Sequence, residues 1–360
     1  MGKVGRRVGR GEHFDRLHLS PSPSATPTPL PSRERRKQGL VLAPTALRAY
    51  LSVMSTGDPF DIFARFGVTS PLAPGQNVEA GRAAFRRATR LIEDAPPKIA
   101  KMRELDVPGA DGPIKARLYV PNDADETGPL ILFMHGGGYV FCDLDTHDGV
   151  CRRIAAIAQV RVLSVDYRLA PEHPFPAAYE DSLAAFDWLA GEGADELGAD
   201  RDRLGVAGDS AGGGLVAAIA QARRNQIKHQ FLIYPLLQVT ETRKVKQKLL
   251  EGHMLSQHAL DWIRDTYVPT PEERADPRVS PLLTNELADC PETFLASAEL
   301  DPLTDDGLVY ADKLEASGVK VTRDFAKALP HGFYNGTRAL PGATKAFDRA
   351  AVAVGAALRS

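Results

Sequence analysis

A pentapeptide between a predicted strand and a predicted helix restricts the folds open to this chain. Gly208-Asp-Ser-Ala-Gly212 directly follows the apolar residues 204–207 and directly precedes an alanine-rich amphipathic segment that extends to about Arg224. A serine on a sharp strand-to-helix turn has strained backbone angles, and glycines two residues to either side relieve the crowding. Such a turn also places the Ser210 hydroxyl near the positive end of the helix dipole, which favours a developing anion. This context predicts a nucleophilic serine on an α/β sheet.

Strands and helices alternate from residue 114 to the end of the sequence. Residues 130–134 are continuously apolar between Pro129 and a glycine cluster, which is typical of a strand buried on both faces of a parallel sheet. We expect the other strands at 114–120, 160–165, 204–207, 231–234, 293–296 and 319–325, and helices at 148–158, 177–190, 210–224, 304–317 and 343–358. This alternation predicts a mostly parallel central sheet with helices on both faces.

Two mainly helical segments, residues 41–95 and about 239–275, interrupt the alternation. In the first of them, Phe85, Ala88 and Leu91 form an apolar stripe at helical spacing. Ligands of open α/β sheets bind beyond the carboxyl ends of the strands. We therefore predict that the two segments form a helical cap over the site.

The rest of the chain divides into a catalytic domain and a tail. Residues 96–238 and 276–360 are expected to form the α/β-hydrolase domain. Residues 1–40 carry nine basic and three acidic side chains and include a stretch rich in proline and serine. Such a segment has too little apolar surface to offset the entropy of ordering it. We therefore predict a disordered tail.

Composition and charge exclude several classes of function. The sequence has 43% hydrophobic and 25% charged residues and a net charge of −2, so we expect no general affinity for nucleic acid or anionic membranes. No apolar run approaches the ~18 residues that a membrane span needs, and the basic N-terminus lacks the apolar region of a secretory signal. We predict a cytoplasmic protein without a membrane span, which binds a small-molecule substrate and forms a homodimer.

The cysteines indicate neither disulfides nor a metal centre. Cys142, Cys151 and Cys290 are odd in number and sparse, and no two of them stand at the spacing of metal ligands. In a cytoplasmic protein this pattern is typical of reduced thiols that are buried or half-buried. The sequence therefore predicts no metal site.

Two candidate partners for Ser210 follow later strands. A serine hydroxyl needs a base to take its proton, and the base needs an acid to fix its tautomer, in the chain order serine, acid, histidine for this fold. Asp301 and His331 each come just past a predicted strand, so both would lie on the rim of the sheet that carries Ser210. Three neighbouring carboxylates stay open as alternatives for the acid: Glu299, Asp305 and Asp306.

A run of glycines, His135-Gly136-Gly137-Gly138, follows the buried strand at 130–134. Backbone N–H groups can approach a developing oxyanion there because no side chain blocks them. We assign the oxyanion hole to the N–H groups of Gly136, Gly137 and Ala211. We expect His135 to brace the loop, and Gly138 and Asp209 to support the site.

Four segments together resemble the bacterial hormone-sensitive-lipase-like family of α/β-hydrolase esterases. They are Phe133-Met-His-Gly-Gly-Gly-Tyr139, Asp166-Tyr-Arg-Leu-Ala-Pro-Glu172, Gly208-Asp-Ser-Ala-Gly-Gly213, and Asp301-Pro-Leu303 with His331-Gly-Phe333. The resemblance spans roughly residues 115–335 and implies a carboxylesterase for short-acyl esters that needs no cofactor. It also implies a triad of Ser210, Asp301 and His331 beneath a helical cap, with residues 166–172 supporting the site.

Other interpretations share parts of this pattern. Chymotrypsin-like proteases also carry Gly-Asp-Ser, but they are all-β and their histidine and aspartate precede the serine, which excludes them here. An amidase or peptidase would use the same triad and stays open. A non-catalytic ligand-binding protein on this scaffold would tolerate loss of the base, whereas His331 is present in full context. The sequence favours a carboxylesterase that hydrolyses short- to medium-chain acyl esters through an acyl-enzyme intermediate.

Overall fold

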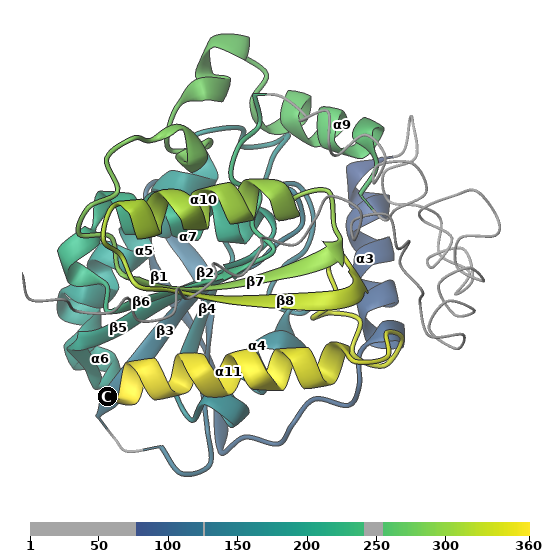
Figure 1. The fold of residues 1–360 in the computed structure, drawn as a ribbon. Coiled ribbons are helices and arrows are strands. Elements are labelled where there is room, and N and C mark those ends of the chain that lie inside the picture. The colour runs from purple at the N-terminus through teal and green to yellow at the C-terminus, as the bar shows by residue number, and fades with distance from the viewer. Residues whose placement is uncertain (1–76, 125–126, 241–254) are drawn as a thin grey trace, which may run out of the picture. The chain divides into compact units, whose positions relative to one another are not determined.

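A central sheet organises the part of the chain that the computed structural model describes, residues 77–124, 127–240 and 255–360. It has eight strands in the order β1-β2-β4-β3-β5-β6-β7-β8 (Figure 1). β2 pairs antiparallel with β1 and β4, and the remaining pairs are parallel. The strands are β1 (Lys101–Gly109), β2 (Gly112–Val120), β3 (Gly128–Met134), β4 (Arg161–Val165), β5 (Ala199–Asp209), β6 (His229–Ile233), β7 (Glu292–Leu300) and β8 (Val321–Pro330). The predicted mostly parallel sheet is confirmed.

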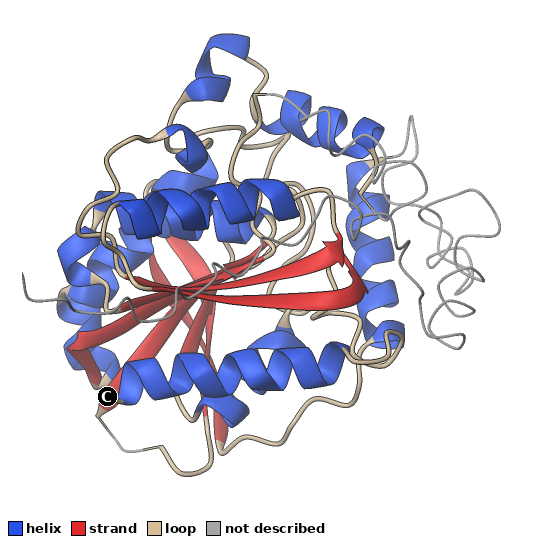
Figure 2. Ribbon diagram, in the orientation of Figure 1, coloured by secondary structure: helices blue, strands red, loops and turns tan. Residues whose placement is uncertain are grey.

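Helices cover both faces of this sheet (Figure 2). The described helices are α3 (Val78–Ile92), α4 (Asp148–Ala158), α5 (Ala177–Ala190), α6 (Glu192–Leu197), α7 (Ala211–Ala222), α9 (Gln257–Tyr267), α10 (Thr304–Ala316) and α11 (Ala343–Arg359). Three short 3-10 helices occupy connections: η2 (Arg224–Gln226), η4 (Pro271–Ala275) and η5 (Pro281–Leu283). None of the helices in this part of the chain is long and apolar enough to cross a membrane.

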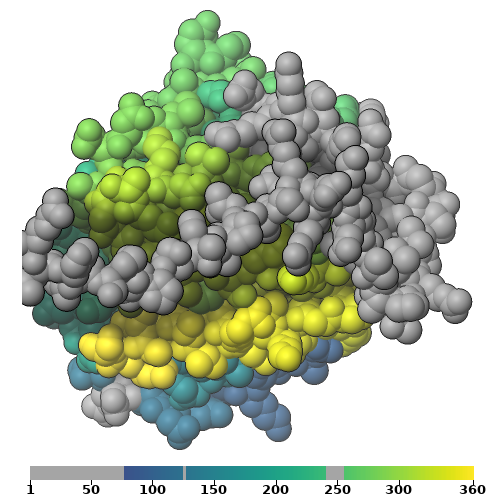
Figure 3. Space-filling view, in the orientation of Figure 1, coloured from purple at the N-terminus to yellow at the C-terminus, as the bar shows by residue number. Residues whose placement is uncertain are grey.

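Two apolar cores lie on opposite faces of the sheet. One contains Phe186 of α5, Leu215 of α7 and Tyr310 of α10. The other contains Ile154 of α4 and Phe347 of α11. α10 and α11 form two bands across the face seen in the space-filling view (Figure 3). The sheet is thus buried on both sides, and its ligand-binding edge is left at the carboxyl ends of the parallel strands.

The first strand of the sheet was not expected from the sequence. β1 is an edge strand whose residues are mostly exposed, and it contains charged residues and Pro108 instead of an apolar run. Edge strands commonly carry such residues because they block pairing with another chain. β1 is held by an antiparallel ladder with β2, in which Gly109 pairs with Gly112 across the turn.

The predicted helical stripe of the first cap segment is partly wrong. α3 buries Ala84, Ala88 and Ile92, whereas Leu91 is 39% exposed. The helix therefore turns a slightly different face toward the protein than the stripe through Leu91 suggested. The predicted tail at 1–40, and residues 41–76 and 241–254 of the predicted cap, lie outside the described residues.

α11 packs closely against α4 through a glycine. A Cβ added at Gly355 would lie 2.2 Å from the carbonyl oxygen of Ala158. Only glycine permits this approach without displacing one of the two helices.

We therefore expect Gly355→Ala to destabilise the protein by about 1–3 kcal/mol, because the added methyl overpacks the contact. Helix propensity alone would have the opposite sign, since alanine stabilises a helix interior by up to ~1 kcal/mol relative to glycine. Urea denaturation measures the difference. The exposed neighbour on the same helix provides the control, and Ala356→Ser should change stability by no more than about 0.5 kcal/mol. A Gly355→Ala variant more stable than wild type would contradict the packing.

α3 ends at a glutamate whose carboxyl group is enclosed. Glu93 is the C-terminal cap of α3, and its Oε2 would lie 2.5 Å from a Cβ at Gly149, in the first turn of α4. Burial raises the pKa of the Glu93 carboxyl to about 8, and the carboxylates of Asp148 and Asp209 add to the effect. The native protein therefore keeps this proton at pH values where an unfolded chain has lost it.

This difference gives stability a pH dependence with a defined sign. Since the native state binds the extra proton, the free energy of unfolding should fall as the pH rises from about 4.5 to about 8. Glu93→Gln removes this dependence. The melting temperature of this variant should therefore rise relative to that of wild type as the pH increases from about 5 to about 8. Glu79→Gln, at a 71% exposed side chain of the same helix, serves as control. If the difference in melting temperature between wild type and Glu93→Gln does not change with pH, the raised pKa assigned to Glu93 is wrong.

Candidate active site

Ser210 lies at a sharp turn between β5 and α7. Its backbone angles are φ 52° and ψ −117°, a conformation that costs a non-glycine residue about 1–3 kcal/mol. Two backbone hydrogen bonds hold the turn, from Ser210 N to Ile233 O (2.9 Å) and from Leu236 N to Ser210 O (2.8 Å). Glycines are required beside it, because a Cβ at Gly208 would lie 2.6 Å from the backbone of Gly212. The strained turn inferred from the sequence is present.

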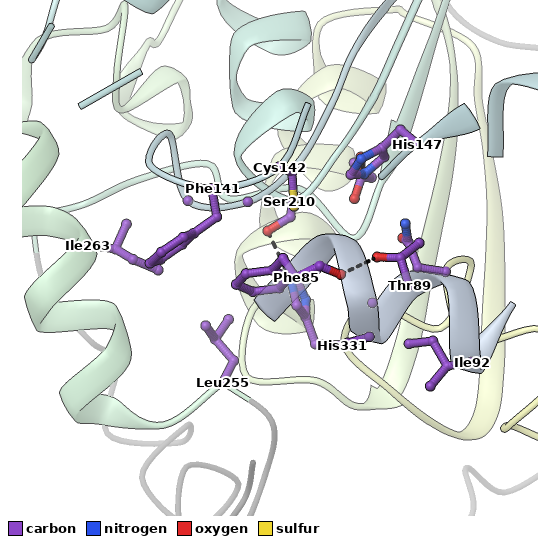
Figure 4. A pocket seen from close by; sticks show the side chains of 16 residues that line it. Phe85, Thr89, Ile92, Phe141, Cys142, His147, Ser210, Leu255, Ile263 and His331 are labelled. Carbon is purple, nitrogen blue, oxygen red and sulfur yellow. Dashed lines mark hydrogen bonds and ion pairs between the residues drawn. The ribbon is translucent and has the colours of Figure 1, made fainter. Parts of the chain in front are cut away.

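The structure brings Ser210, His331 and Asp301 together in one hydrogen-bonded series. His331 Nε2 lies 2.9 Å from Ser210 Oγ (Figure 4), and His331 Nδ1 lies 2.9 Å from Asp301 Oδ2. Asp301 is 1% exposed, and its other oxygen accepts from Leu303 N at 2.8 Å. The ring of Tyr234 packs edge-on against the His331 imidazole, with 4.9 Å between centroids. The imidazole is therefore held at both nitrogens and on one face.

The alternative acids point elsewhere. Glu299 Oε2 accepts a hydrogen bond from Ala328 N at 2.8 Å, and Asp306 Oδ2 lies 3.2 Å from the amide of Gln238. Asp305 belongs to the first turn of α10. Of these carboxylates, Asp301 is the one that contacts His331.

The glycine loop after β3 requires one correction to the predicted oxyanion hole. The N–H group of Gly136 donates to Asp209 Oδ1 at 2.7 Å, so it is not directed at a substrate. Gly137 and Gly138 have positive φ angles of 109° and 64°, and both line the pocket. Their N–H groups donate to no other described residue. The loop therefore offers the amides of Gly137 and Gly138 instead of those of Gly136 and Gly137.

His135 lies beneath this loop and not in the pocket. It is fully buried, its ring donates from Nδ1 to Gly136 O at 2.8 Å, and it stacks on Tyr167 with 4.4 Å between centroids. Tyr167 in turn donates its hydroxyl to His135 O at 2.6 Å. Burial, together with the nearby His147, lowers the pKa of His135 to about 4. These contacts are those of a brace, and they give residues 166–172 a direct link to the loop.

Helices from both predicted cap segments line the pocket above Ser210. Phe85, Ala88, Thr89 and Ile92 come from α3, and Ile263 comes from α9. To one side of Ser210, Figure 4 shows Phe141, Leu255 and Ile263, and to the other side Thr89, Ile92 and His147. The wall is therefore mostly apolar, with polar groups near the reactive serine.

His147 could not be predicted from the chain order of a triad, because it precedes Ser210 and the last strand. His147 is 2% exposed, lines the pocket, and lies 3.0 Å from Asp209 Oδ1 through Nε2. No local sequence pattern marks it as a residue of the site, so only the tertiary contact with Asp209 identifies it.

The described residues contain no group of three or more histidine, cysteine, aspartate or glutamate side chains that could hold a metal ion. All three cysteines are buried and unpaired.

Comparison with known proteins agrees with this geometry. A family model described as the alpha/beta hydrolase fold matches residues 131–335. The carboxylic ester hydrolase LipN of Mycobacterium tuberculosis is 39% identical over 279 residues, which are 75% of this chain and 73% of LipN. The ethyl acetate hydrolase of Pseudomonas putida is 35% identical over 295 residues, which are 80% of this chain and 90% of that protein.

A solved structure shows the same similarity in three dimensions. The ester-hydrolase EH1AB1 from the metagenome of Lake Arreo superimposes with a TM-score of 0.80 at 36% identity, covering 88% of this chain and 99% of that chain. The match of the family model includes the turn at Ser210 and the loop after β3, because both lie within residues 131–335. The chain therefore belongs to the hormone-sensitive-lipase-like family of α/β-hydrolase serine carboxylesterases.

Proposed function

We propose that this carboxylesterase hydrolyses short- to medium-chain acyl esters through an acyl-enzyme on Ser210. Ser210 Oγ attacks the ester carbonyl while His331 Nε2 takes its proton, and Asp301 holds the imidazole through Nδ1. His331 then protonates the leaving alcohol, and a water molecule repeats the sequence on the acyl group. The observation that carries the proposal is the series of two 2.9 Å contacts joining Ser210, His331 and Asp301.

The oxyanion of the tetrahedral intermediate would be held by three backbone amides. The N–H groups of Gly137 and Gly138 face the pocket without another described partner, and Ala211 begins α7. The first N–H groups of a helix have no partner within it and point toward negative charge. Donors that are already aimed before the reaction stabilise the transition state without reorganisation.

The apolar wall supports an acyl chain of limited length. α3 and α9 cross the carboxyl ends of the strands and enclose the pocket with Phe85, Ile92 and Ile263. We propose that they form the described part of the helical cap, over a catalytic domain of residues 96–238 and 276–360. The name of the Pseudomonas putida relative, ethyl acetate hydrolase, supports small esters as substrates. An amidase or peptidase would use the same groups and is separated by experiment.

Ser210→Ala should lower turnover of a p-nitrophenyl ester on the order of 10⁴-fold or more, because the acyl-enzyme can no longer form. Steady-state kinetics on a short-chain ester measure the loss. Ser317→Ala, at the C-terminal cap of α10 and not among the residues lining the pocket, should stay within about twofold of wild type. Near-normal activity of Ser210→Ala would sink the assignment of the nucleophile.

The substrate class follows from a series of p-nitrophenyl esters from C2 to C16 with an anilide beside them. We expect kcat/KM to peak at about C4–C8 and anilide cleavage to be negligible, because an apolar pocket of limited size favours short chains by about 1–3 kcal/mol per fitted or clashing methylene. A maximum at C16 would indicate a lipase, and preferred anilide cleavage would indicate an amidase. Either result would replace the proposed specificity.

Two further predictions from the sequence concern the cellular location and the oligomeric state of the enzyme. A cytoplasmic location stays a prediction, as does a homodimer. Light scattering coupled to gel filtration measures the oligomeric state directly.

A further inference from the structure

His147 occupies an unusual place beside the reaction centre. It directly precedes α4, is 2% exposed, and lines the same pocket as Ser210 (Figure 4). Its Nε2 lies 3.0 Å from Asp209 Oδ1, and its Nδ1 lies 3.1 Å from Thr146 Oγ1. Nδ1 is within hydrogen-bond distance of Thr146, whereas Nε2 lies close to the Asp209 carboxylate without the geometry of a hydrogen bond.

The partner of His147 is the carboxylate next to the nucleophile. Asp209 is 5% exposed, and its Oδ1 also accepts the Gly136 N–H at 2.7 Å. Burial by itself raises the pKa of Asp209, but the contacts with His147 and the Gly136 amide outweigh it and leave the pKa below its usual value. Asp209 is therefore charged, and it ties the first glycine of the oxyanion loop to the strand that carries Ser210.

The negative charge of the Asp209 carboxylate lies close to the proposed oxyanion site and needs a compensating group. The oxyanion would form at the amides of Gly137 and Gly138, directly after the residue that Asp209 holds. An unneutralised carboxylate in a poorly solvated site would oppose that charge, since electrostatic interactions are strong where water is excluded. The imidazole of His147 lies against this carboxylate, with 3.0 Å between Nε2 and Asp209 Oδ1, and its interaction with Asp209 helps to lower the pKa of the carboxyl group.

The contacts continue from His147 to the helix above the pocket. Thr146 Oγ1 accepts from Asp143 N at 2.8 Å, and Asp143 Oδ1 accepts from Thr146 N at 2.9 Å. The other oxygen of Asp143 accepts from Arg86 of α3. A second arginine of the helix, Arg82, donates to Val140 O at 2.9 Å. α3 is thus joined to both the start and the middle of the segment between the glycines and His147.

We propose that His147 is a positioning residue for the oxyanion loop, holding the Asp209 carboxylate against the Gly136 N–H group, and that Arg86 joins α3 to this network through Asp143 and Thr146. The inference rests on the proposed function, because it assumes that the Gly137 and Gly138 amides stabilise an oxyanion. Loss of His147 should therefore destabilise the transition state more than it weakens the binding of the ester.

Two substitutions of His147 separate hydrogen bonding from packing. His147→Phe keeps a planar ring but offers no donor to Asp209, and we expect kcat to fall about 10- to 100-fold with KM changed less than about threefold, because small displacements of aligned groups have effects of this size. His147→Gln retains an amide donor and should recover a substantial part of the lost kcat. His258→Gln, at an exposed histidine of α9, is the matched control and should resemble wild type.

The surface end of the network is tested without disturbing the interior. Arg86 is 40% exposed, so Arg86→Gln should fold normally and lower kcat about 3- to 10-fold, since it loosens Asp143 only indirectly. Arg87→Gln, the adjacent exposed arginine of α3, should have no such effect. The Arg86→Gln and His147→Gln changes combined should reduce kcat by less than the product of the separate effects, because both act through the same contacts.

The outcomes distinguish this inference from the proposed function. Full kcat in His147→Phe, alongside an inactive Ser210→Ala variant, would overturn the positioning role and leave the triad standing. Near-normal activity of the Ser210→Ala variant would contradict the proposed function itself. A His147→Phe variant that raises KM with kcat unchanged would show that His147 contacts substrate, and would also overturn the proposal. If His147→Phe does not fold, equal kcat values for Arg86→Gln and Arg87→Gln would overturn it instead.

Discussion

The close approach of Gly212 to the carbonyl group of Met134 is the contact on which the site depends. A Cβ at position 212 would lie 2.0 Å from Met134 O, so only glycine lets the first turn of α7 rest on the end of β3. β3 and β5 are parallel neighbours, and their carboxyl ends therefore lie at one edge of the sheet. The contact brings the glycine loop after β3 and the turn after β5 to the same place, where Gly137, Gly138 and Ser210 line one pocket.

The neighbouring strands supply the remaining groups in spatial order. β6, β7 and β8 follow β5 across the sheet, and each ends in a residue at the site. Tyr234 follows β6, Asp301 follows β7 and His331 follows β8. Tyr234 lies between the serine turn and the two later residues in the sheet order, and its ring contacts the His331 imidazole. The geometry of the triad is therefore a consequence of strand order as much as of local side-chain contacts.

Helix α3 completes the site through charge as well as through apolar packing. One face of the helix presents Phe85, Ala88 and Ile92 to the pocket. Another face carries Arg82 and Arg86, whose guanidinium groups bind Glu172 and Asp143. Exposed ion pairs contribute little to stability on average, but Arg82 also donates to two backbone carbonyls, Val140 O beside the glycines and Ala170 O in the segment after β4. The same helix thus lines the pocket and contacts the segment that follows the glycines.

Much of the fold and of the candidate site follows from the sequence. The features that were missed have no local sequence pattern. The strand positions, the turn at Ser210, and the placement of Asp301 and His331 past later strands were predicted because each has a local pattern. β1 was missed because an exposed edge strand has no apolar run. Gly136 was assigned to the wrong role because its amide is taken by Asp209, which lies 73 residues away.

By itself, the sequence determined the architecture, because apolar runs and glycine turns act locally and parallel strands end at a common edge. It also determined which residues reach that edge. Only the tertiary structure decided which polar groups meet there: Gly136 with Asp209, Asp209 with His147, and Asp301 instead of its neighbours with His331. The physical reason is that buried polar groups must find partners, and those partners come from segments that no local pattern connects.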